Sequence, residues 1–267
     1  MAHFYQIINE GGKDECQLLK DITTVPQWRK WLKENDDMAY ASITTKLDVA
    51  PNGFMDSWRI KEAIRITKEN PSLSDEDVLT QLWGMRECPA TGEPITSSDF
   101  GTQGHKHLEI SVQCRLAGAE WEDDFWEPYV VPFHKWMWEQ SVEPISAEVA
   151  VYCHRRKVAG TVDLFAVQNK RIQVYDYKFR DGRKNKKNVR EKDVMQMAVQ
   201  ASIVKDKLDL PYMPEAHTVL ICPFEATMRV VKWEKEKQDA ALERFEVLSR
   251  FWDEWFGGAA TSTSNQP

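Results

Sequence analysis

Two neighbouring segments, both rich in β-branched and aromatic residues, constrain the fold of this chain most strongly. Residues 159–167 and 172–179 are separated by Gln168-Asn169-Lys170, and this pattern predicts two strands joined by a short turn. Because side chains alternate along a strand, Asp176 and Lys178 are expected on one face of the second strand. The tyrosines that alternate with them are expected on the opposite face.

A partner strand could bring a second carboxylate, that of Asp163, beside this pair. Two carboxylates and one ammonium group at the same end of a sheet suit a divalent cation and the water that it activates. The alternative is a pair of strands with solvated charges and one salt bridge, because the spacing of Asp176 and Lys178 is common in isolation. The context in the rest of the chain favours the metal site.

The chain of 267 residues is long enough to bury a full core, as one large domain or two small ones. Its 35 Lys and Arg residues against 42 Asp and Glu residues give a net charge of −7, which excludes a generic polyanion binder. No apolar run approaches the roughly 18 residues that span a bilayer, and the first residues lack the pattern of a secretory signal. Five irregularly spaced cysteines suit a reducing compartment, so a cytoplasmic protein without membrane contact is expected.

One segment departs from this acidic balance. Residues 180–192 contain seven cationic side chains against two acidic ones, a local charge of +5. The cationic residues are Arg180, Arg183, Lys184, Lys186, Lys187, Arg190 and Lys192. Such a run is usually a solvated loop, but its position directly after the strand of Asp176 and Lys178 makes phosphate binding an equal alternative.

The rest of the chain alternates between strand and helix periodicity. Strands are expected at 4–9, 16–20, 148–152, 217–221 and 228–233, and helices at 26–34, 55–68, 74–83, 101–116, 189–204 and 236–255. Residues 86–98 are rich in Pro, Gly and Ser and indicate a loop. Aromatic residues recur every four positions from Trp121 to Phe133. A buried helical stripe is favoured over a base-stacking platform, because core packing produces this period.

Taken in chain order, the chemically distinctive elements are a helix with His105, a strand with Glu148, a strand with Asp163, a strand with Asp176 and Lys178, and a helix with Gln196. Four segments match a known pattern: Gly101-Thr102-Gln103-Gly104-His105-Lys106-His107-Leu108-Glu109, Ala159-Gly160-Thr161-Val162-Asp163, Asp176-Tyr177-Lys178 and Gln196-Met197-Ala198-Val199-Gln200. In this order they resemble the PD-(D/E)xK nuclease superfamily, and within it the RecB-like exonuclease branch. The resemblance covers about residues 95–235. Ser42-Ile43-Thr44 and Trp58 resemble the segment that precedes the core in phage exonucleases and mitochondrial genome maintenance exonucleases.

The resemblance implies a role for each matching residue. The implied metal ligands are His105, Asp163, Asp176 and the carbonyl of Tyr177. Lys178 would position or deprotonate the attacking water, and Gln196 would orient the substrate or Lys178. Candidates around this site are Glu148, Glu109 and Gln200. The resemblance adds Ser42 and Thr44 as expected DNA-binding residues to those of the basic segment, which are Arg180, Arg183, Lys184, Lys186, Lys187 and Arg190.

The implied cofactor is Mg²⁺ or Mn²⁺, and a lone imidazole among carboxylates shifts the preference toward Mn²⁺. Some relatives carry an iron–sulfur cluster on one early and three late cysteines. This chain has only Cys222 after Cys153, so no such cluster is expected.

The implied fold is α/β, with a restriction-endonuclease-like core at 96–257 whose mixed central sheet is flanked by helices. A mainly helical extension at 1–95 would pack on this core, and a disordered tail would follow at 258–267. The implied activity is that of a metal-dependent DNA exonuclease that works from a free end in recombination, repair or replication. A single-strand annealing or binding protein is a candidate partner, and a phage enzyme acting in the host cytoplasm is one candidate origin.

Two other functions remain open on the same residues. One is a single-strand or structure-specific endonuclease built on the same core. The other is a non-catalytic protein that binds DNA ends, although the presence of Asp163, Asp176 and Lys178 argues against a decayed site.

Overall fold

A computed structural model of the chain describes residues 2–10, 13–35, 38–49, 53–83, 85–87, 94–121, 126–180, 189–222 and 227–256. The strands are β1 (Phe4–Glu10), β2 (Lys13–Leu18), β3 (Met38–Ser42), β4 (Met85–Glu87), β5 (Pro94–Thr96), β6 (Glu143–Cys153), β7 (Val158–Gln168), β8 (Arg171–Phe179), β9 (Glu215–Cys222) and β10 (Thr227–Trp233). The helices are α1 (Val25–Glu34), α2 (Ile43–Leu47), α3 (Gly53–Glu69), α4 (Asp75–Trp83), α5 (Ser97–Ala117), α6 (Glu127–Glu139), α7 (Glu191–Lys207) and α8 (Lys235–Trp255).

Within these residues the strands form one large mixed sheet and one small pair. The large sheet runs β10-β9-β8-β7-β3-β1-β2, and β6 pairs with β7. β8 and β9 are parallel, as are β3 and β7, whereas the hairpins β1–β2, β6–β7, β7–β8 and β9–β10 are antiparallel. The expected mixed α/β fold with a central sheet flanked by helices is therefore present.

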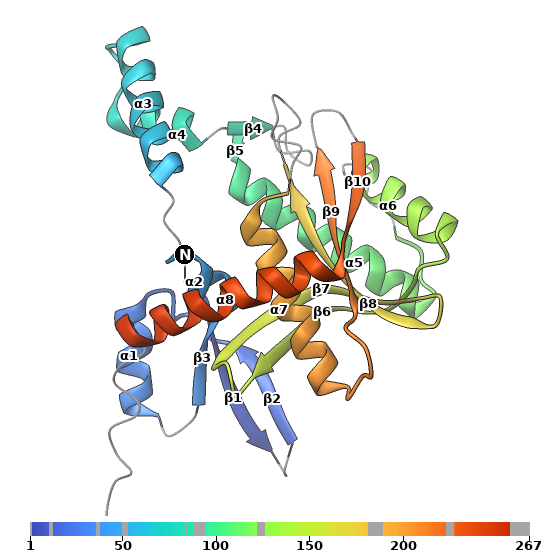
Figure 1. The fold of residues 1–267 in the computed structure, drawn as a ribbon. Helices are drawn as coiled ribbons and strands as arrows, with labels where there is room; N and C mark the ends of the chain where they lie inside the picture. Colours follow the sequence, from blue (N-terminus) through green and yellow to red (C-terminus); the bar gives the residue numbers. More distant parts are fainter. Residues whose placement is uncertain are drawn as a thin grey trace, which may run out of the picture.

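The first third of the chain differs from the expected helical extension. β1, β2 and β3 belong to the large sheet, because Ala41 and Ser42 pair in parallel with Val158 and Ala159. Among the described elements, α3 and α4 project from the body, beyond the two-stranded β4–β5 pair (Figure 1). This pair and the start of α5 also occupy the part of residues 86–98 that is described, where a loop was expected. The tail at 258–267 lies outside the described residues.

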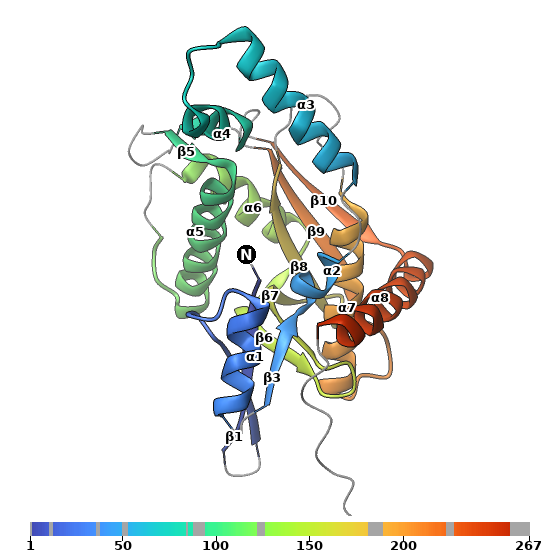
Figure 2. The ribbon, with the colours of Figure 1, turned by 90° about the vertical axis from the view of Figure 1, so that its left-hand side faces the viewer.

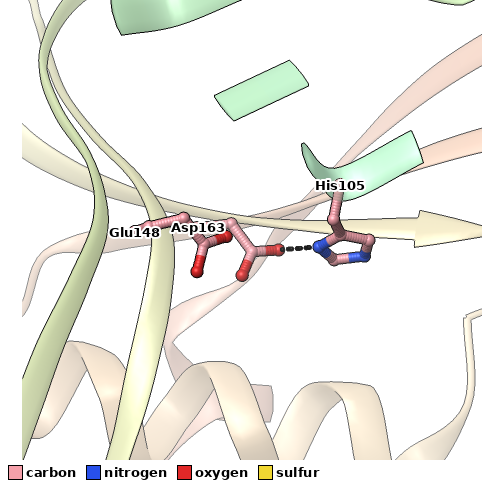
Figure 3. A group of neighbouring side chains, drawn as sticks. All are labelled: His105, Glu148 and Asp163. Atoms are coloured by element: carbon pink, nitrogen blue, oxygen red, sulfur yellow. Dashed lines mark ion pairs between the residues drawn. The ribbon is translucent and has the colours of Figure 1, made fainter. Parts of the chain in front are cut away.

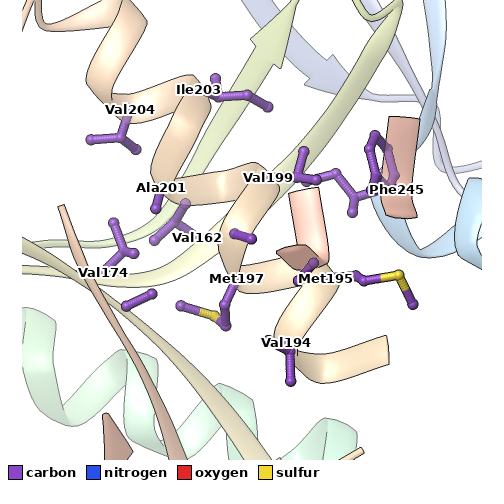
Figure 4. Close-up of a cluster of buried hydrophobic side chains, with 14 of the residues drawn as sticks. Val162, Val174, Val194, Met195, Met197, Val199, Ala201, Ile203, Val204 and Phe245 are labelled. Atoms are coloured by element: carbon purple, nitrogen blue, oxygen red, sulfur yellow. The ribbon is translucent and has the colours of Figure 1, made fainter. Parts of the chain in front are cut away.

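Two apolar layers cover the sheet. α7 and α8 lie on one side and α5 and α6 on the other (Figure 2). On the first side α7 is buried along most of its length, and its Met197 and Val199 pack with Val162, Val174 and Phe245 (Figure 4). α7 carries apolar residues all round, as expected for a helix enclosed between a sheet and a second helix.

The second layer contains the aromatic stripe anticipated from sequence. Phe133 is buried in edge-on contact with Tyr177 of β8, and Trp126 is buried in the same apolar cluster, which confirms the packing interpretation for these residues. Trp138, by contrast, is 76% exposed.

A buried lysine fixes α2 to the C-terminal helix. The side chain of Lys46 is fully buried, and its Nζ atom donates to the carbonyl of Arg156 at 3.0 Å, to Oγ of Ser249 at 2.9 Å and to Oδ1 of Asp253 at 2.8 Å. Three elements distant in sequence are therefore joined at one ammonium group.

No helix in the described part of the chain is both long enough and apolar enough to cross a membrane.

Candidate metal centre

The candidate site lies where β7 changes partners. The start of β7 pairs with β3 up to Ala159, and its end pairs with β8 from Leu164 onward. Between these points, the described strands leave this edge of β7 without a backbone partner, and Asp163 lies there. Oδ2 of Asp163 instead accepts a hydrogen bond of 2.7 Å from the backbone N–H of Tyr177. The opening in the sheet thus holds a carboxylate that is only 6% exposed.

Glu148 faces Asp163 from β6. The β6–β7 ladder pairs Val149 with Val162, which sets Glu148 opposite Asp163. The backbone of Glu148 has a φ of 51°, in the left-handed region that costs a non-glycine residue about 1–3 kcal/mol. The strained residue presents its carboxylate beside that of Asp163 (Figure 3).

His105 completes the group from α5. Its Nδ1 atom lies 3.3 Å from Oδ2 of Asp163 (Figure 3). One ligand atom from each of His105, Glu148 and Asp163 lies within 4.8 Å of the other two. Burial lowers the pKa of the His105 imidazole more than the Asp163 carboxylate raises it. The ring is therefore held neutral, which is the form that binds a metal.

The donor set fits a divalent cation. Glu148 is exposed at one side, but the protein around its carboxyl group removes water from it. This desolvation, followed by the negative charge of Asp163, raises the pKa of Glu148 to about 8. A cation between the two carboxylates would remove that cost, because it favours their ionised forms. Two carboxylates and one neutral imidazole suit Mg²⁺ or Mn²⁺, with the nitrogen ligand favouring Mn²⁺.

A second group of side chains lies beside the first, on β8 and α7. Nζ of Lys178 lies 2.7 Å from both carboxylate oxygens of Asp176 and donates to Oε1 of Gln196 at 3.3 Å. Nε2 of Gln196 donates to Oδ1 of Asp176 at 2.8 Å. The contact between Asp176 and Lys178 confirms that they share a face of β8.

Burial and charge act in opposite directions on this second group. Burial raises the pKa of Asp176 to about 7. Burial lowers the pKa of Lys178. The negative charges of Asp176 and Asp163 raise it by more, so the net effect is a raised pKa. Lys178 is thus held as an ammonium group between two acids.

The structure divides the expected metal ligands between two neighbouring groups of side chains. His105 and Asp163 are together as expected, and the Tyr177 backbone is hydrogen-bonded to the ring of His105. Asp176, expected as a ligand, has its oxygens on Lys178 and Gln196. Glu148, expected only in the surroundings, is grouped directly with His105 and Asp163.

The remaining residues expected near the site have structural partners. Nε2 of Gln200 donates to the carbonyl of Thr161 at 2.6 Å and so ties α7 to the open edge of β7. Glu109 pairs with Lys106 at 2.8 Å and accepts from Gln113 at 2.9 Å, one turn of α5 beyond His105.

Four of the expected DNA-binding residues lie in the described part of the chain. Ser42 is buried and caps α2 by accepting from the backbone N–H of Thr45, whereas Thr44 is exposed. Arg180 donates to both carboxylate oxygens of Asp193 at 2.9 and 3.0 Å, and Arg190 is exposed at the start of α7. The basic residues between them, Arg183, Lys184, Lys186 and Lys187, lie outside the described residues, as does the side chain of Trp58.

The direct grouping of Glu148 with His105 and Asp163 was not predicted from sequence, although a signal for it existed. The basic turn at 154–157 joins β6 to β7, so Cys153 opposes Val158. In an antiparallel hairpin each step back along one strand matches a step forward along the other. Moving five residues back from Cys153 along β6 and five residues forward from Val158 along β7 places Glu148 opposite Asp163.

No protein-family model matches the chain. No curated protein sequence matches it either. Among solved structures 21 chains match, one of which is described as the crystal structure of SSO0001. It aligns with a TM-score of 0.31 and 13% sequence identity, over 70% of this chain and 70% of that chain.

Proposed function

We propose that this protein is a divalent-metal-dependent deoxyribonuclease with a restriction-endonuclease-like core of the RecB-like branch, and that it acts as an exonuclease. One observation supports the proposal above all others. The group formed by His105, Glu148 and Asp163 lies directly beside a buried Asp176–Lys178 pair, at an opening in a mixed sheet. Hydrolysis of a phosphodiester needs an activated water and stabilisation of the charge that develops on the phosphate, and a cation site beside an ammonium group can supply both.

Each side chain of the site has a task in this reaction. His105, Glu148 and Asp163 would hold Mg²⁺ or Mn²⁺. When bound, such an ion lowers the pKa of a coordinated water and neutralises phosphate charge. Lys178 is paired with Asp176, and the charges of Asp176 and Asp163 keep it protonated, so we assign to it the orientation of the water and the stabilisation of charge on the phosphate. Gln196 contacts both Asp176 and Lys178 and fixes the direction of the ammonium group.

The proposed substrate is DNA with a free end. In support, Thr44 and Arg190 are exposed, and the basic segment at 180–192 follows β8 directly. In an acidic protein, this local charge would bind phosphates while the rest of the surface repels them. A role in recombination, repair or replication, with a single-strand annealing or binding protein as partner, belongs to the same proposal, as does action in the cytoplasm.

One digestion separates the candidate activities. Linear and covalently closed circular single-stranded DNA, both labelled, are incubated with the protein in Mg²⁺, in Mn²⁺ and in EDTA, with the Lys178→Ala variant as a matched control. Metal-dependent loss of the linear DNA alone supports the exonuclease. Equal cutting of circles would assign the endonuclease instead. DNA binding without cleavage in either metal would leave only an end-binding protein and refute the nuclease.

A further inference from the structure

α5 approaches β8 unusually closely at one residue. A Cβ atom built on Gly104 would lie 2.2 Å from Cζ of Phe179, and 2.5 and 2.6 Å from the two Cε atoms of the same ring. Real Cβ atoms essentially never make contacts this short, so no side chain fits here unless something moves. One turn earlier on the same helix, a Cβ atom on Gly101 would meet nothing within 4 Å.

The ring of Phe179 is held on several sides. Its centroid lies 5.9 Å from that of Phe100 and 6.2 Å from that of Trp126, both in edge-on contacts. The third aromatic neighbour is the imidazole of His105, whose centroid is 5.9 Å away. A methyl group at position 104 would therefore push either α5 away from β8 or the phenyl ring against its neighbours, including His105.

Intrinsic helix preference does not explain a glycine at this position. Gly104 lies inside a helix of 21 residues, where glycine costs about 1 kcal/mol relative to alanine. The glycine at position 104 is explained if the close approach of α5 to β8 is needed for function. The residue that benefits is the next one in the chain, since the position of His105 relative to Asp163 depends on how closely α5 lies against β8.

We propose that the contact between Gly104 and Phe179 positions His105 for metal binding by setting the separation of α5 and β8. This inference rests on the proposed metal-dependent function. Ligand distances at a metal vary by only about 0.2 Å, so a shift of the helix that the fold tolerates is enough to remove one ligand. Gly104 and Phe179 touch no substrate in this proposal and act only through His105.

The test is Mn²⁺ binding, measured by titration calorimetry and by pulsed electron paramagnetic resonance, which detects the nitrogen of a coordinated imidazole. Gly104→Ala is expected to weaken Mn²⁺ binding roughly 10–100-fold, as is typical when a group supporting a ligand is changed, and to lose the nitrogen signal. The matched control, Gly101→Ala, is the same change in the same helix, and it is expected to keep both.

The double variant Gly104→Ala/Phe179→Leu distinguishes a positioning role from a general loss of stability. Leucine lacks the three ring atoms that the added methyl group would meet, so Gly104→Ala should have no effect on Mn²⁺ affinity in the Phe179→Leu background. This comparison also applies if the single Gly104→Ala variant does not fold.

The possible outcomes are distinct. A wild-type protein that binds no Mn²⁺ refutes the metal centre, and with it this inference. A wild-type protein that binds Mn²⁺ with a nitrogen signal, together with a Gly104→Ala variant that does the same, refutes the positioning role alone. An equal loss of affinity from Gly104→Ala in the Phe179 and Phe179→Leu backgrounds also refutes it.

Discussion

Glu148 combines a strained backbone with a place among the candidate metal ligands, so Glu148→Gly should affect stability in opposite directions with and without metal. Glycine adopts a φ of 51° without the strain of about 1–3 kcal/mol that a glutamate bears there. Against this, glycine loses about 0.5–1 kcal/mol more conformational entropy on folding. In metal-free buffer the variant should therefore be more stable than wild type by about 1 kcal/mol, or about 2–4 °C in melting temperature.

Manganese should reverse this order. At a concentration 100 times its dissociation constant, a ligand stabilises the folded state by about 2.7 kcal/mol. A variant that has lost one of three protein ligands and binds about a hundredfold more weakly gains only about 0.4 kcal/mol under the same conditions. Wild type should then be the more stable protein, by about 1.3 kcal/mol.

The assay is thermal unfolding followed by circular dichroism, in EDTA and in a Mn²⁺ series. Lys170→Gly is the matched control, because Lys170 has a φ of 61° in the exposed β7–β8 turn, remote from the metal ligands in sequence and register. It should gain stability in EDTA and respond to Mn²⁺ like wild type. If Glu148→Gly responds to Mn²⁺ as the control does, Glu148 is not a ligand and its strain has another origin.

Three further predictions follow from the same structure. Lys178→Ala should lower the cleavage rate by about 10²–10⁴-fold while keeping Mn²⁺ binding, as measured by single-turnover kinetics and titration; an unchanged rate would exclude the assigned role. Lys46→Ala should lower the free energy of urea unfolding by about 3 kcal/mol, because three buried hydrogen bonds to a charged group are lost; a change below about 1 kcal/mol would contradict this. Burial lowers the pKa of His217 to about 4, so the unfolded state takes up its proton first as the pH falls from 6.5, and stability should decrease between pH 6.5 and 4. His217→Phe, which keeps the stacking on Tyr175, should flatten that melting-temperature profile, and an equally steep profile would exclude His217 as a cause.

The central hairpin could be predicted because its signals are local. Composition marks β7 and β8, and alternation alone places Asp176 and Lys178 on one face, where they are found in contact. The turn was expected at 168–170. In the structure Gln168 pairs with Arg171, so the turn consists of Asn169 and Lys170, both of which have a positive φ. An error of one residue in a turn changes the face of every side chain in the partner strand. The position of Glu148 depends in the same way on the turn at 154–157, which sets the register of β6 against β7.

The place of the first strands in the large sheet could not be predicted for a different reason. The neighbouring segments 4–9 and 16–20 suggest a hairpin, which the pairing of β1 with β2 confirms, but periodicity does not show which distant strand lies beside β3. Here the partner of β3 is β7, far along the chain, and the pairing consists of only two residue pairs. The close approach of Gly104 to Phe179 is equally non-local, since the spacing of α5 residues contains no information about the ring that fills the space.

The parallel pairing of β3 with β7 orders events during synthesis on the ribosome. β3 cannot pair with β7 until Val158, the partner of Ala41, has been synthesised 117 residues later (158 − 41). At about 5–20 residues per second, this wait lasts roughly 6–23 s. During that time β1, β2 and β3 form at most a three-stranded sheet with an unpaired edge, exposed to chaperones, proteases and other nascent chains. The emergence of β7 ends this exposure and, in the same event, brings Asp163 to the edge where the candidate metal centre forms.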